Sequence, residues 1–488
     1  MKKIVSEIRN RTISHNLMAI AEEEISMKAI THDNHSLLYK ENLTLPTFQV
    51  IVMTANMECN HCRRRVFKVV SKITGLREYT LDVSKKQVTF KGDFKEMKKV
   101  QRFLSSDILF DVLSRIQAKP LLGLKCISRD WNQIISSPSF VKAQLRKTEI
   151  VVTGFILQEK FKWCKDDIKT VSYIPIKTTE NGAKVHHDVF NFLPEDFVVL
   201  ASCQGLVCGR SCFPSSEPAI YICNPAIKQW IMLDWPDYDR NESIGLAFDF
   251  DPSKDSIEMH TNFKLVRVKQ VENSDEDEEV ELHLEFELYS SELRTWMKLD
   301  EICYCGNNLI KNKSIYIGGV LHWLTEGDQV LTFDVEKELS WLISVPVPAL
   351  VFYSIPEACI GESEGKLHYV LISEEGLHIW YLEDYYDFQW TLKHCKTLDE
   401  IEGEFPQFFF NLKNRVSMRV SVDSSPWMNP LDFKDGILLM KVCVNLYLYD
   451  INSNKMVQAC TLHDLNSESM SCPTVLSHSL SLVPLHHA

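Results

Sequence analysis

The sequence has no long uninterrupted apolar run, and this argues against a membrane-spanning helix. Its first residues, Met-Lys-Lys-Ile-Val-Ser-Glu-Ile-Arg-Asn, lack the apolar core of a secretory signal peptide. Its last residues, Pro-Leu-His-His-Ala, are not a prenylation signal. These absences predict an intracellular protein of the cytoplasm, the nucleus or both, with no membrane partner.

Recognisable catalytic motifs are also missing. The sequence contains no phosphate-binding loop, no nucleophile elbow and no pair of carboxylates spaced for acid–base chemistry. The net charge of −13 argues against general nucleic-acid binding. The 15 cysteines are odd in number and scattered, and without a secretory signal they predict free thiols in a reducing compartment. The sequence therefore favours a binding protein over an enzyme.

The 488 residues are enough for two to four domains, and the pattern changes several times along the chain. Residues 1–45 show no sustained period, so we expect a disordered segment there. Two small modules are predicted at residues 46–103 and 104–146, and strands and turns dominate residues 150–488. The predicted fold class is a multidomain combination of α+β and all-β parts.

A Cys-x-x-Cys motif marks the module at residues 46–103. Alternating apolar residues predict a first strand from Phe48, and a helix, two strands and a second helix follow. This order is a ferredoxin-like βαββα arrangement. It resembles the heavy-metal-associated domain of copper chaperones and related plant metal-binding proteins. The resemblance implies a last strand that is missing here, which leaves one sheet edge unpaired. Either the domain is incomplete or two neighbouring genes have been joined.

Cys59 and Cys62 are the predicted metal ligands of this module. One lies at the end of a loop and the other in the first helical turn, so both sulfurs point to one place. The helix N-terminus and the neighbouring Arg63–Arg65 favour thiolates over thiols. Two soft thiolates suit Cu(I), with Zn(II) as a competitor. In the resembled family these two cysteines are the ligands. The alternative is a pair of inert or redox-active thiols.

Residues 104–146 predict short amphipathic helices with a Lys-Pro break between the first two. Apolar residues recur at three- and four-residue spacing before the break, and Pro120 suits the first turn of the next helix. So small a unit has too little interior for all its apolar positions, which predicts a docking face. The residue order, including Leu124–Trp131 and Ile134–Phe140, resembles the plant form of the F-box, the adaptor-binding module of cullin-type ubiquitin ligases.

The F-box resemblance implies binding to a Skp-type adaptor and its cullin complex. Ser105 and Gln117 stand where the family usually has proline, and Pro120 stands where serine is usual. These departures predict weaker adaptor binding, not its loss. The residues predicted to bind the partner are Leu104, Ile108, Leu109, Leu113, Ile116, Pro120, Leu121 and Leu122.

A repeated two-part signature fills residues 150–488. A glycine opens an apolar strand, as in Gly319–Trp323, and a short hairpin with an acidic or amide residue follows, as in Phe333–Trp341. Hairpins recur at about 45 residues, the period of a β-propeller blade. Several segments, among them Ser202–Cys208 and Cys223–Ala226, resemble the Kelch-like associated domain of plant F-box proteins. Trp230, Trp296, Trp341 and Trp390 recur once per hairpin and are predicted to pack the blades.

Other candidate groups have ordinary structural explanations. Cys203, Cys208, Cys212, Cys303 and Cys305 lack zinc-site spacing and are expected to be core or surface thiols. His322 lies in an apolar strand, where a buried structural role is the usual one.

The sequence therefore predicts a non-catalytic, substrate-recognition subunit of a Skp-cullin-F-box ubiquitin ligase that recruits an unknown protein. A metallochaperone or metal sensor, built on the Cys-x-x-Cys module, is the alternative. An oxidase-type propeller enzyme would need a metal or radical site that is not recognisable here.

Overall fold

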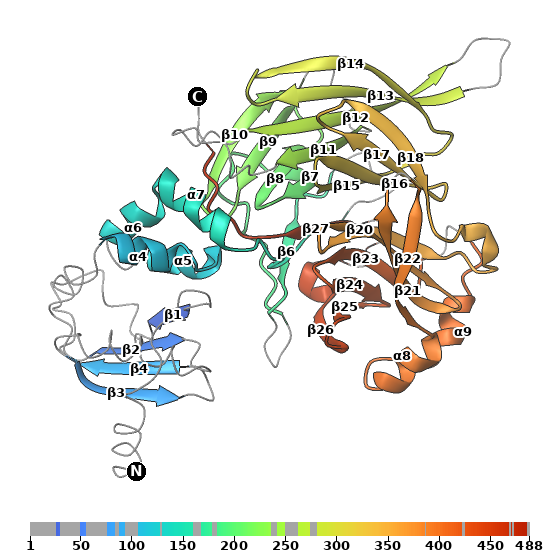
Figure 1. The fold of residues 1–488 in the computed structure, drawn as a ribbon. Coiled ribbons are helices and arrows are strands. Elements are labelled where there is room, and N and C mark those ends of the chain that lie inside the picture. Colours follow the sequence, from blue (N-terminus) through green and yellow to red (C-terminus); the bar gives the residue numbers. More distant parts are fainter. Residues whose placement is uncertain are drawn as a thin grey trace. The chain divides into compact units, whose positions relative to one another are not determined.

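The computed structural model describes residues 26–29, 49–54, 76–82, 87–92, 106–126, 129–159, 167–177, 183–235, 242–248, 262–273, 281–385, 387–421, 425–467, 470 and 473–485. The chain divides into two compact units, one of residues 1–149 with 252–259 and one of residues 150–251 with 260–488. The first holds a small sheet and a helical module, and the second is a β-propeller (Figure 1). No helix in the described ranges has the length and apolarity needed to cross a membrane.

The small sheet contains the three strands that the sequence predicts and one that it does not. The strands are β1 (Ser26–Ala29), β2 (Gln49–Thr54), β3 (Leu76–Asp82) and β4 (Gln87–Gly92), in the order β1-β2-β4-β3. β1 runs antiparallel to β2, with Ser26 opposite Thr54 and Ala29 opposite Ile51. The prediction of an unpaired edge beside β2 is therefore corrected, because a strand from the N-terminal 45 residues occupies that edge. The helices predicted for this module lie outside the described residues.

The helical module consists of α4 (Ser106–Leu113), α5 (Ala118–Leu124), α6 (Arg129–Ile135) and α7 (Pro138–Lys147). Ser137 caps α7, because its hydroxyl accepts a hydrogen bond from the Phe140 backbone N–H, and Pro138 occupies the first turn, where its missing N–H costs nothing. Phe110 of α4 packs edge-on against the buried Phe140, with 5.4 Å between the ring centroids. Lys147 Nζ donates to Asp111 Oδ1 at 2.7 Å, which ties α7 back to α4.

The second unit is built from four-stranded antiparallel blades. Three blades are separate sheets, two more join into an eight-stranded sheet, and a three-stranded sheet completes the set. The strands are β7 (Phe197–Cys203), β8 (Leu206–Ser211), β9 (Ala219–Asn224), β10 (Gln229–Asp234), β11 (Ser243–Phe248), β12 (Phe263–Asn273), β13 (Glu281–Ser290), β14 (Thr295–Tyr304), β15 (Leu309–Ile317), β16 (Val320–Thr325), β17 (Gln329–Asp334), β18 (Leu339–Ser344), β19 (Glu357–Ser363), β20 (Lys366–Ser373), β21 (Gly376–Asp384), β22 (Gln389–Lys396), β23 (Met428–Lys434), β24 (Ile437–Val442), β25 (Asn445–Asp450) and β26 (Lys455–Thr461), with the last blade formed by β27 (Thr474–His478), β5 (Gly154–Gln158) and β6 (Val171–Pro175).

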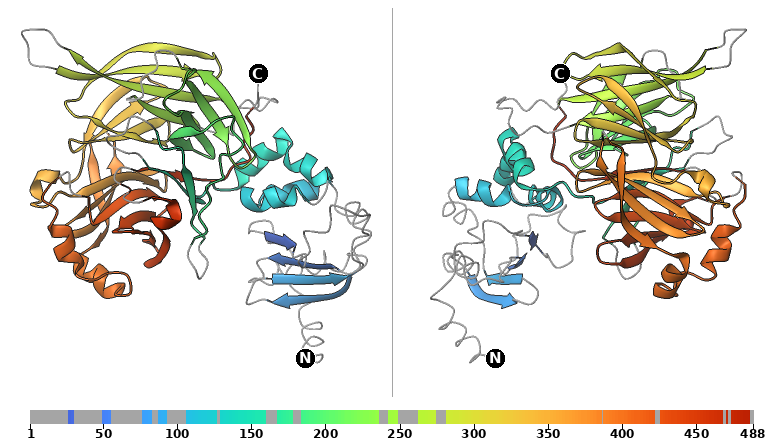
Figure 2. Two further views of the ribbon diagram at one scale, coloured as in Figure 1. Left: turned by 180° about the vertical axis from the view of Figure 1, so that it is seen from behind. Right: turned by 45° about the vertical axis from the view of Figure 1, so that its right-hand side comes forward.

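The first strands of the blades form a closed ring. Contacts run from β7 to β11, β15, β19, β23 and β27 in turn, and β27 contacts β7 again. The ring closes because β27, near the C-terminus, pairs antiparallel with β5 at the start of the unit, with Leu476 opposite Ile156. Figures 1 and 2 show the red β27 beside green strands of the propeller's start. The described blades therefore number six, one of them shared between the two ends of the unit.

The repeated glycines lie in the turns between the first and second strands. Gly205 has φ +90, a conformation that residues with a Cβ rarely adopt, and an added Cβ would collide with Ser481 of the C-terminal segment. Gly361 of β19 lets Phe433 of β23 approach closely, and this is where the two blades of the eight-stranded sheet pair in parallel. The glycine of the repeat thus reflects turn geometry, whereas Gly361, which is not part of the repeat, reflects close backbone approach.

The acidic and amide residues of the repeat close the hairpins between the third and fourth strands. Asp334 Oδ1 accepts hydrogen bonds from the backbone N–H groups of Glu336 and Lys337, and Asp450 Oδ1 accepts one from Asn452. Asn224 does the same for Ala226, and its amide also donates to the Ser481 and Val483 carbonyls at 3.2 and 2.8 Å. Local Asx turns therefore explain the recurrence of Asp and Asn at this position.

The four tryptophans lie on the fourth strands, and two of them link neighbouring blades. The Trp296 indole N–H donates to the Asp234 carbonyl at the end of β10, and the Trp390 N–H donates to the Ser344 carbonyl at the end of β18. Trp230 and Trp341 pack against the buried side chains of their blades. The prediction that these residues pack the blades is confirmed.

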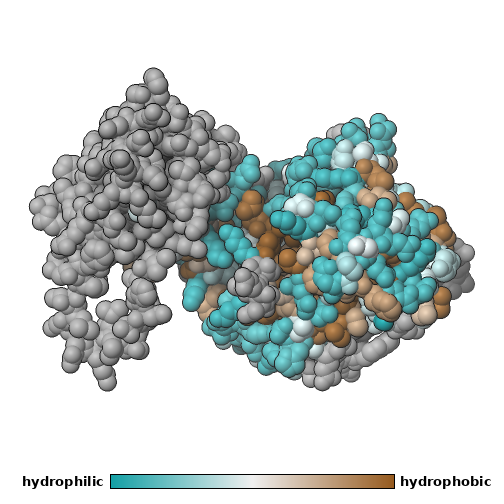
Figure 3. Space-filling model, turned by 90° about the horizontal axis from the view of Figure 1, so that it is seen from below, coloured by the Kyte–Doolittle hydropathy of each residue, from teal (hydrophilic) through white to brown (hydrophobic). Residues whose placement is uncertain are grey.

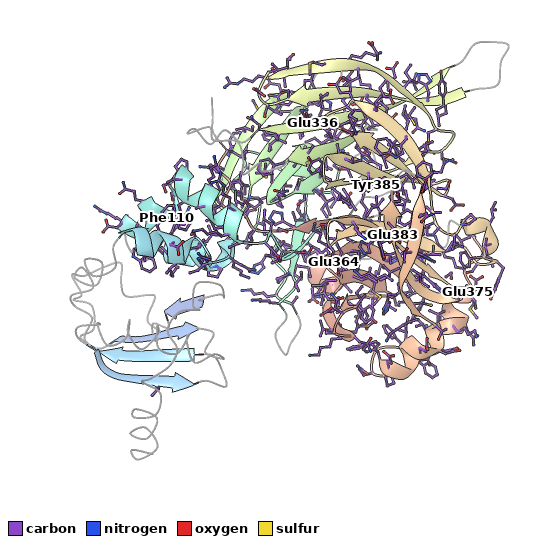
Figure 4. The ribbon with its side chains drawn as sticks, in the orientation of Figure 1. Phe110, Glu336, Glu364, Glu375, Glu383 and Tyr385 are labelled. Carbon is purple, nitrogen blue, oxygen red and sulfur yellow. The ribbon has the colours of Figure 1, made fainter. Side chains whose placement is uncertain are left out.

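Antiparallel pairing places the turns and connections of the propeller on two opposite faces. The turn face carries the first-to-second and third-to-fourth strand turns, and the loop face carries the second-to-third turns and the connections to the next blade. Glu364 and Glu375 flank β20 and mark the turn face and the loop face of one blade (Figure 4). The helices α8 (Leu398–Glu404) and α9 (Leu412–Ser417) and the short helices η1 (Ala349–Val351) and η2 (His463–Leu465) all fall in connections on the loop face.

Candidate partner-binding and metal sites

The helical module keeps part of its apolar surface accessible. Leu109 of α4 and Pro120 and Leu122 of α5 are partly exposed, as is Phe110, which Figure 4 labels on α4. Phe110 was not among the predicted partner-binding residues, although its position next to Leu109 in the apolar period could have signalled it. These four side chains leave apolar surface accessible on both α4 and α5.

Three of the predicted partner-binding residues are core residues in the structure. Leu113, Ile116 and Leu121 have exposed fractions of 1%, 3% and 0%. Their burial makes them supports of the helix packing in the chain without its partner, and a direct contact with the adaptor stays a prediction for these three residues. Helical periodicity identifies an apolar face but does not say which part of it a short helix buries. Leu104 lies outside the described residues, and so does the side chain of Ile108.

Polar contacts fix the relative position of the helices behind the accessible surface. The Gln144 amide of α7 donates to the Ile116 carbonyl after α4 at 3.3 Å. The hydrogen bond from Lys147, which Arg115 reinforces, lowers the pKa of the Asp111 carboxyl. Lys147 also donates to the Ser114 hydroxyl at 2.9 Å. The partly exposed side chains therefore stand on a framework that is already ordered, which reduces the entropy lost on binding.

The predicted metal ligands Cys59 and Cys62 lie outside the described residues. Among the residues that the structure does describe, no group of three or more His, Cys, Asp and Glu side chains could hold a metal ion. The cysteines in those ranges are free thiols. Burial raises the pKa of Cys212 to about 11 and that of Cys208 further, so both are protonated and unreactive at neutral pH.

His322 is a structural residue, as its sequence context predicts. It is fully buried, its Nδ1 lies 3.1 Å from the Ile315 carbonyl, and its Nε2 lies 3.1 Å from the Tyr385 hydroxyl. Burial lowers its pKa to about 4, although the hydrogen bond with Ile315 acts in the opposite direction. His368 and His478 are also buried, and burial lowers each pKa to about 4.

Acidification from pH 7 to pH 5 is expected to destabilise the propeller through these three histidines. Well above pH 6.5 they are neutral in both states and add no pH dependence. Below it the unfolded chain binds protons that the folded chain does not, so stability falls until the folded pKa near 4 is reached. Each histidine contributes about 1.4 kcal/mol per pH unit at most. Urea unfolding across this range measures the slope, and His478→Gln should reduce it; an unchanged slope contradicts the assignment.

Comparison with known proteins gives three domain matches along the chain. Residues 51–106 match the heavy-metal-associated domain, residues 103–143 the F-box domain, and residues 183–416 the β-propeller of the "F-box protein At3g26010-like" family. The three matches follow the order predicted from the sequence.

Curated relatives from Arabidopsis thaliana are named as F-box proteins. F-box protein At5g49610 is 22% identical over 62% of this chain and 81% of its own length, and F-box protein At5g07610 is 23% identical over 62% and 72%. F-box/kelch-repeat protein At3g23880 is 21% identical over 48% of this chain and 63% of its own. Among solved structures, apo AztD from Citrobacter koseri covers 68% of the chain at 8% identity, with a TM-score of 0.32 that is too low to support an argument.

Proposed function

We propose that this chain is the substrate-recognition subunit of a Skp-cullin-F-box ubiquitin ligase, because it matches both the F-box domain and the β-propeller of a family of F-box proteins. The observation that carries the proposal is that one chain joins an F-box module with an accessible apolar surface to a closed propeller. The first would bind a Skp-type adaptor, and the second would hold the protein to be ubiquitinated.

The proposed mechanism is proximity. A substrate bound to the propeller would have its lysines held near a charged conjugating enzyme that other subunits carry, and this raises their effective concentration. In this proposal the chain supplies binding and orientation, and the bond-forming chemistry belongs to the rest of the complex. The buried, neutral histidines and the protonated thiols of the propeller agree with a binding scaffold.

Affinity purification of the tagged chain followed by mass spectrometry tests this function. A Skp-type adaptor and a cullin should co-purify with the wild-type chain, and the adaptor should disappear when the accessible surface of α4 and α5 is changed. An adaptor that is absent from the wild-type preparation would contradict the proposal. Substrates found in the same preparation would then be compared with and without proteasome inhibition.

We further propose that Cys59 and Cys62 bind Cu(I) in the heavy-metal-associated module. The family match over residues 51–106 includes both cysteines, and two thiolates are suitable ligands for a soft monovalent ion. Metal binding and adaptor binding would use different parts of the chain, since the F-box match begins after both cysteines.

The double variant Cys59→Ser/Cys62→Ser is expected to lose copper retention, because a neutral hydroxyl is a poor ligand for Cu(I). Full-length reduced protein and the variant would compete for Cu(I) against a colorimetric chelator. The matched control is Cys395→Ser/Cys443→Ser, which removes two exposed thiols of the propeller. Equal retention by the wild type and the Cys59/Cys62 variant would exclude the site.

A further inference from the structure

Five large apolar side chains stand out from the propeller on its loop face. Their exposed fractions are high for large apolar side chains. Seen from below, the described surface is mixed, with apolar residues gathered among hydrophilic ones (Figure 3). We call the five the apolar patch: Leu350 (94% exposed), Val351 (65%), Tyr353 (72%), Met418 (76%) and Val420 (73%). Contiguous exposed apolar surface on a protein of this kind usually marks an interaction site.

The first segment of the patch is held in place by carboxylates at both ends. Asp328 Oδ2 accepts a hydrogen bond from the Ala349 backbone N–H at 2.9 Å, where η1 begins. Glu374 Oε1 accepts one from the Tyr353 N–H at 3.0 Å, and its other oxygen accepts the Ser354 hydroxyl. Asp328 and Glu374 come from the second-to-third strand turns of two successive blades. The exposed side chains between them are therefore presented by a fixed backbone.

The second segment lies directly beside the first. The Ile355 N–H donates to the Arg419 carbonyl at 2.9 Å, and the Arg419 guanidinium forms an ion pair with Glu357. Met418 and Val420 are the residues on either side of Arg419, and Tyr353 lies two residues before Ile355. The exposed apolar residues of both segments are therefore close in sequence to the hydrogen bond that joins the segments. The α9 helix next to Met418 lies at the same edge of the propeller as Glu375, the marker of the loop face (Figures 1 and 4). The two segments therefore form one surface.

The rim of this surface is acidic on the side of the first segment. Residues 345–356 contain no charged side chain, and the turns that border them carry Glu326, Asp328, Glu374 and Glu375. On the other side, Arg419 is paired with Glu357, Lys413 lies 3.7 Å from Asp399, and the exposed Arg415 lies over the Trp427 ring. The charge available to a partner beside Leu350 and Tyr353 is therefore negative.

We propose that the apolar patch binds a short segment of the recruited protein in which large apolar side chains stand beside lysine or arginine. This inference rests on the proposed function and specifies its substrate class. The apolar side chains of the segment would cover the patch, and its cations would face the carboxylates of the rim. A second copy of this chain fits less well, because it would bring an acidic rim against an acidic rim, and the chain carries a net charge of −13.

A display library of random 12-residue peptides, selected on the full-length chain, tests the proposal. Selected peptides should be enriched in both large apolar residues and Lys or Arg. The variants Leu350→Ser/Tyr353→Ser and Met418→Ser/Val420→Ser should each weaken binding of a selected peptide at least about tenfold, since central aromatic and aliphatic contacts dominate small interfaces. Leu293→Ser is the matched control, because Leu293 is 62% exposed but lies in a turn on the opposite face.

The charge-reversal variant Glu375→Lys tests the contribution of the acidic rim. Glu375 is suitable because this exposed carboxylate is not one of the two that hold the first segment. The variant should bind the selected peptides more weakly and lose part of the salt dependence. Selection of acidic peptides, absence of enrichment, or full binding by both patch variants would overturn the proposal. Dimerisation that the patch variants abolish, seen by analytical ultracentrifugation, would assign the surface to a second copy instead. Adaptor binding, measured in parallel, reports on the proposed function separately.

Discussion

Replacing Leu109 and Leu122 by aspartate is expected to abolish co-purification of a Skp-type adaptor while the chain remains folded. Both side chains are partly exposed, so the change leaves the buried core of the module in place. In an apolar interface the two carboxylates would lose their hydration without gaining a partner, at a cost of several kcal/mol. A loss of affinity of more than about a hundredfold follows, because every 1.4 kcal/mol is a factor of ten.

The controls separate loss of binding from loss of structure. Gln133→Asp adds a carboxylate to an exposed position of α6 and should leave adaptor binding unchanged. Leu121→Asp buries a charge in the core and should unfold the module, so its failure to bind says nothing about the surface. Circular dichroism and thermal unfolding of the double variant check its structure. Full adaptor binding by a folded Leu109→Asp/Leu122→Asp chain would show that the adaptor uses another surface.

Truncation of the chain after residue 472 is expected to prevent cooperative folding of the propeller. The removed segment includes β27, which pairs with β5, and the tail whose carbonyls accept the Asn224 amide. It also carries the buried side chains of Val475, Leu476, Leu482, Val483 and Leu485. Removing one such side chain costs about 2–5 kcal/mol, and a whole domain is stable by only about 5–15 kcal/mol.

The matched control is truncation after residue 485, which removes only the three residues beyond the described C-terminal segment and should be neutral. Thermal unfolding and limited proteolysis of the two truncated chains give the comparison. If the chain ending at residue 472 kept a sharp unfolding transition near that of the wild type, the ring would not depend on closure by β27.

Several elements could be predicted from the sequence because local chemistry determines them. Asp334 and Asp450 recur since an Asx turn needs a short acceptor side chain at that point, and Gly205 is required by a positive φ. The predicted strands of the heavy-metal-associated module agree with β2, β3 and β4. The domain order and the F-box with its associated propeller were confirmed by the family matches.

Features that depend on distant segments could not be predicted. The pairing of β27 with β5 joins residues more than 300 positions apart, and no local pattern encodes that contact. β1 is short, and its four residues show no strand signal until β2 provides an edge to pair with. In the helical module, the same apolar period contains the buried Leu113 and the partly exposed Leu109, and only the packing of α7 against α4 distinguishes them.

Part of the apolar patch corresponds to an apolar run in the sequence, but the composition of this run does not show whether it is buried or exposed. Residues 345–356 form an apolar run without a charge, which also describes a buried strand. The prolines at positions 346, 348 and 356 disfavour strand pairing, and the carboxylates of two neighbouring turns hold the run on the surface. Exposure of Leu350 and Tyr353 is thus a consequence of tertiary structure.

Isothermal titration of the purified full-length chain with a purified Skp-type adaptor tests the central claim most directly. One adaptor is expected to bind per chain, with a negative heat-capacity change from the burial of apolar surface on α4 and α5. The same titration with the Leu109→Asp/Leu122→Asp chain should give no binding heat. A wild-type chain that is folded, as judged by its unfolding transition, and still gives no binding heat would contradict the proposed role in a ubiquitin ligase.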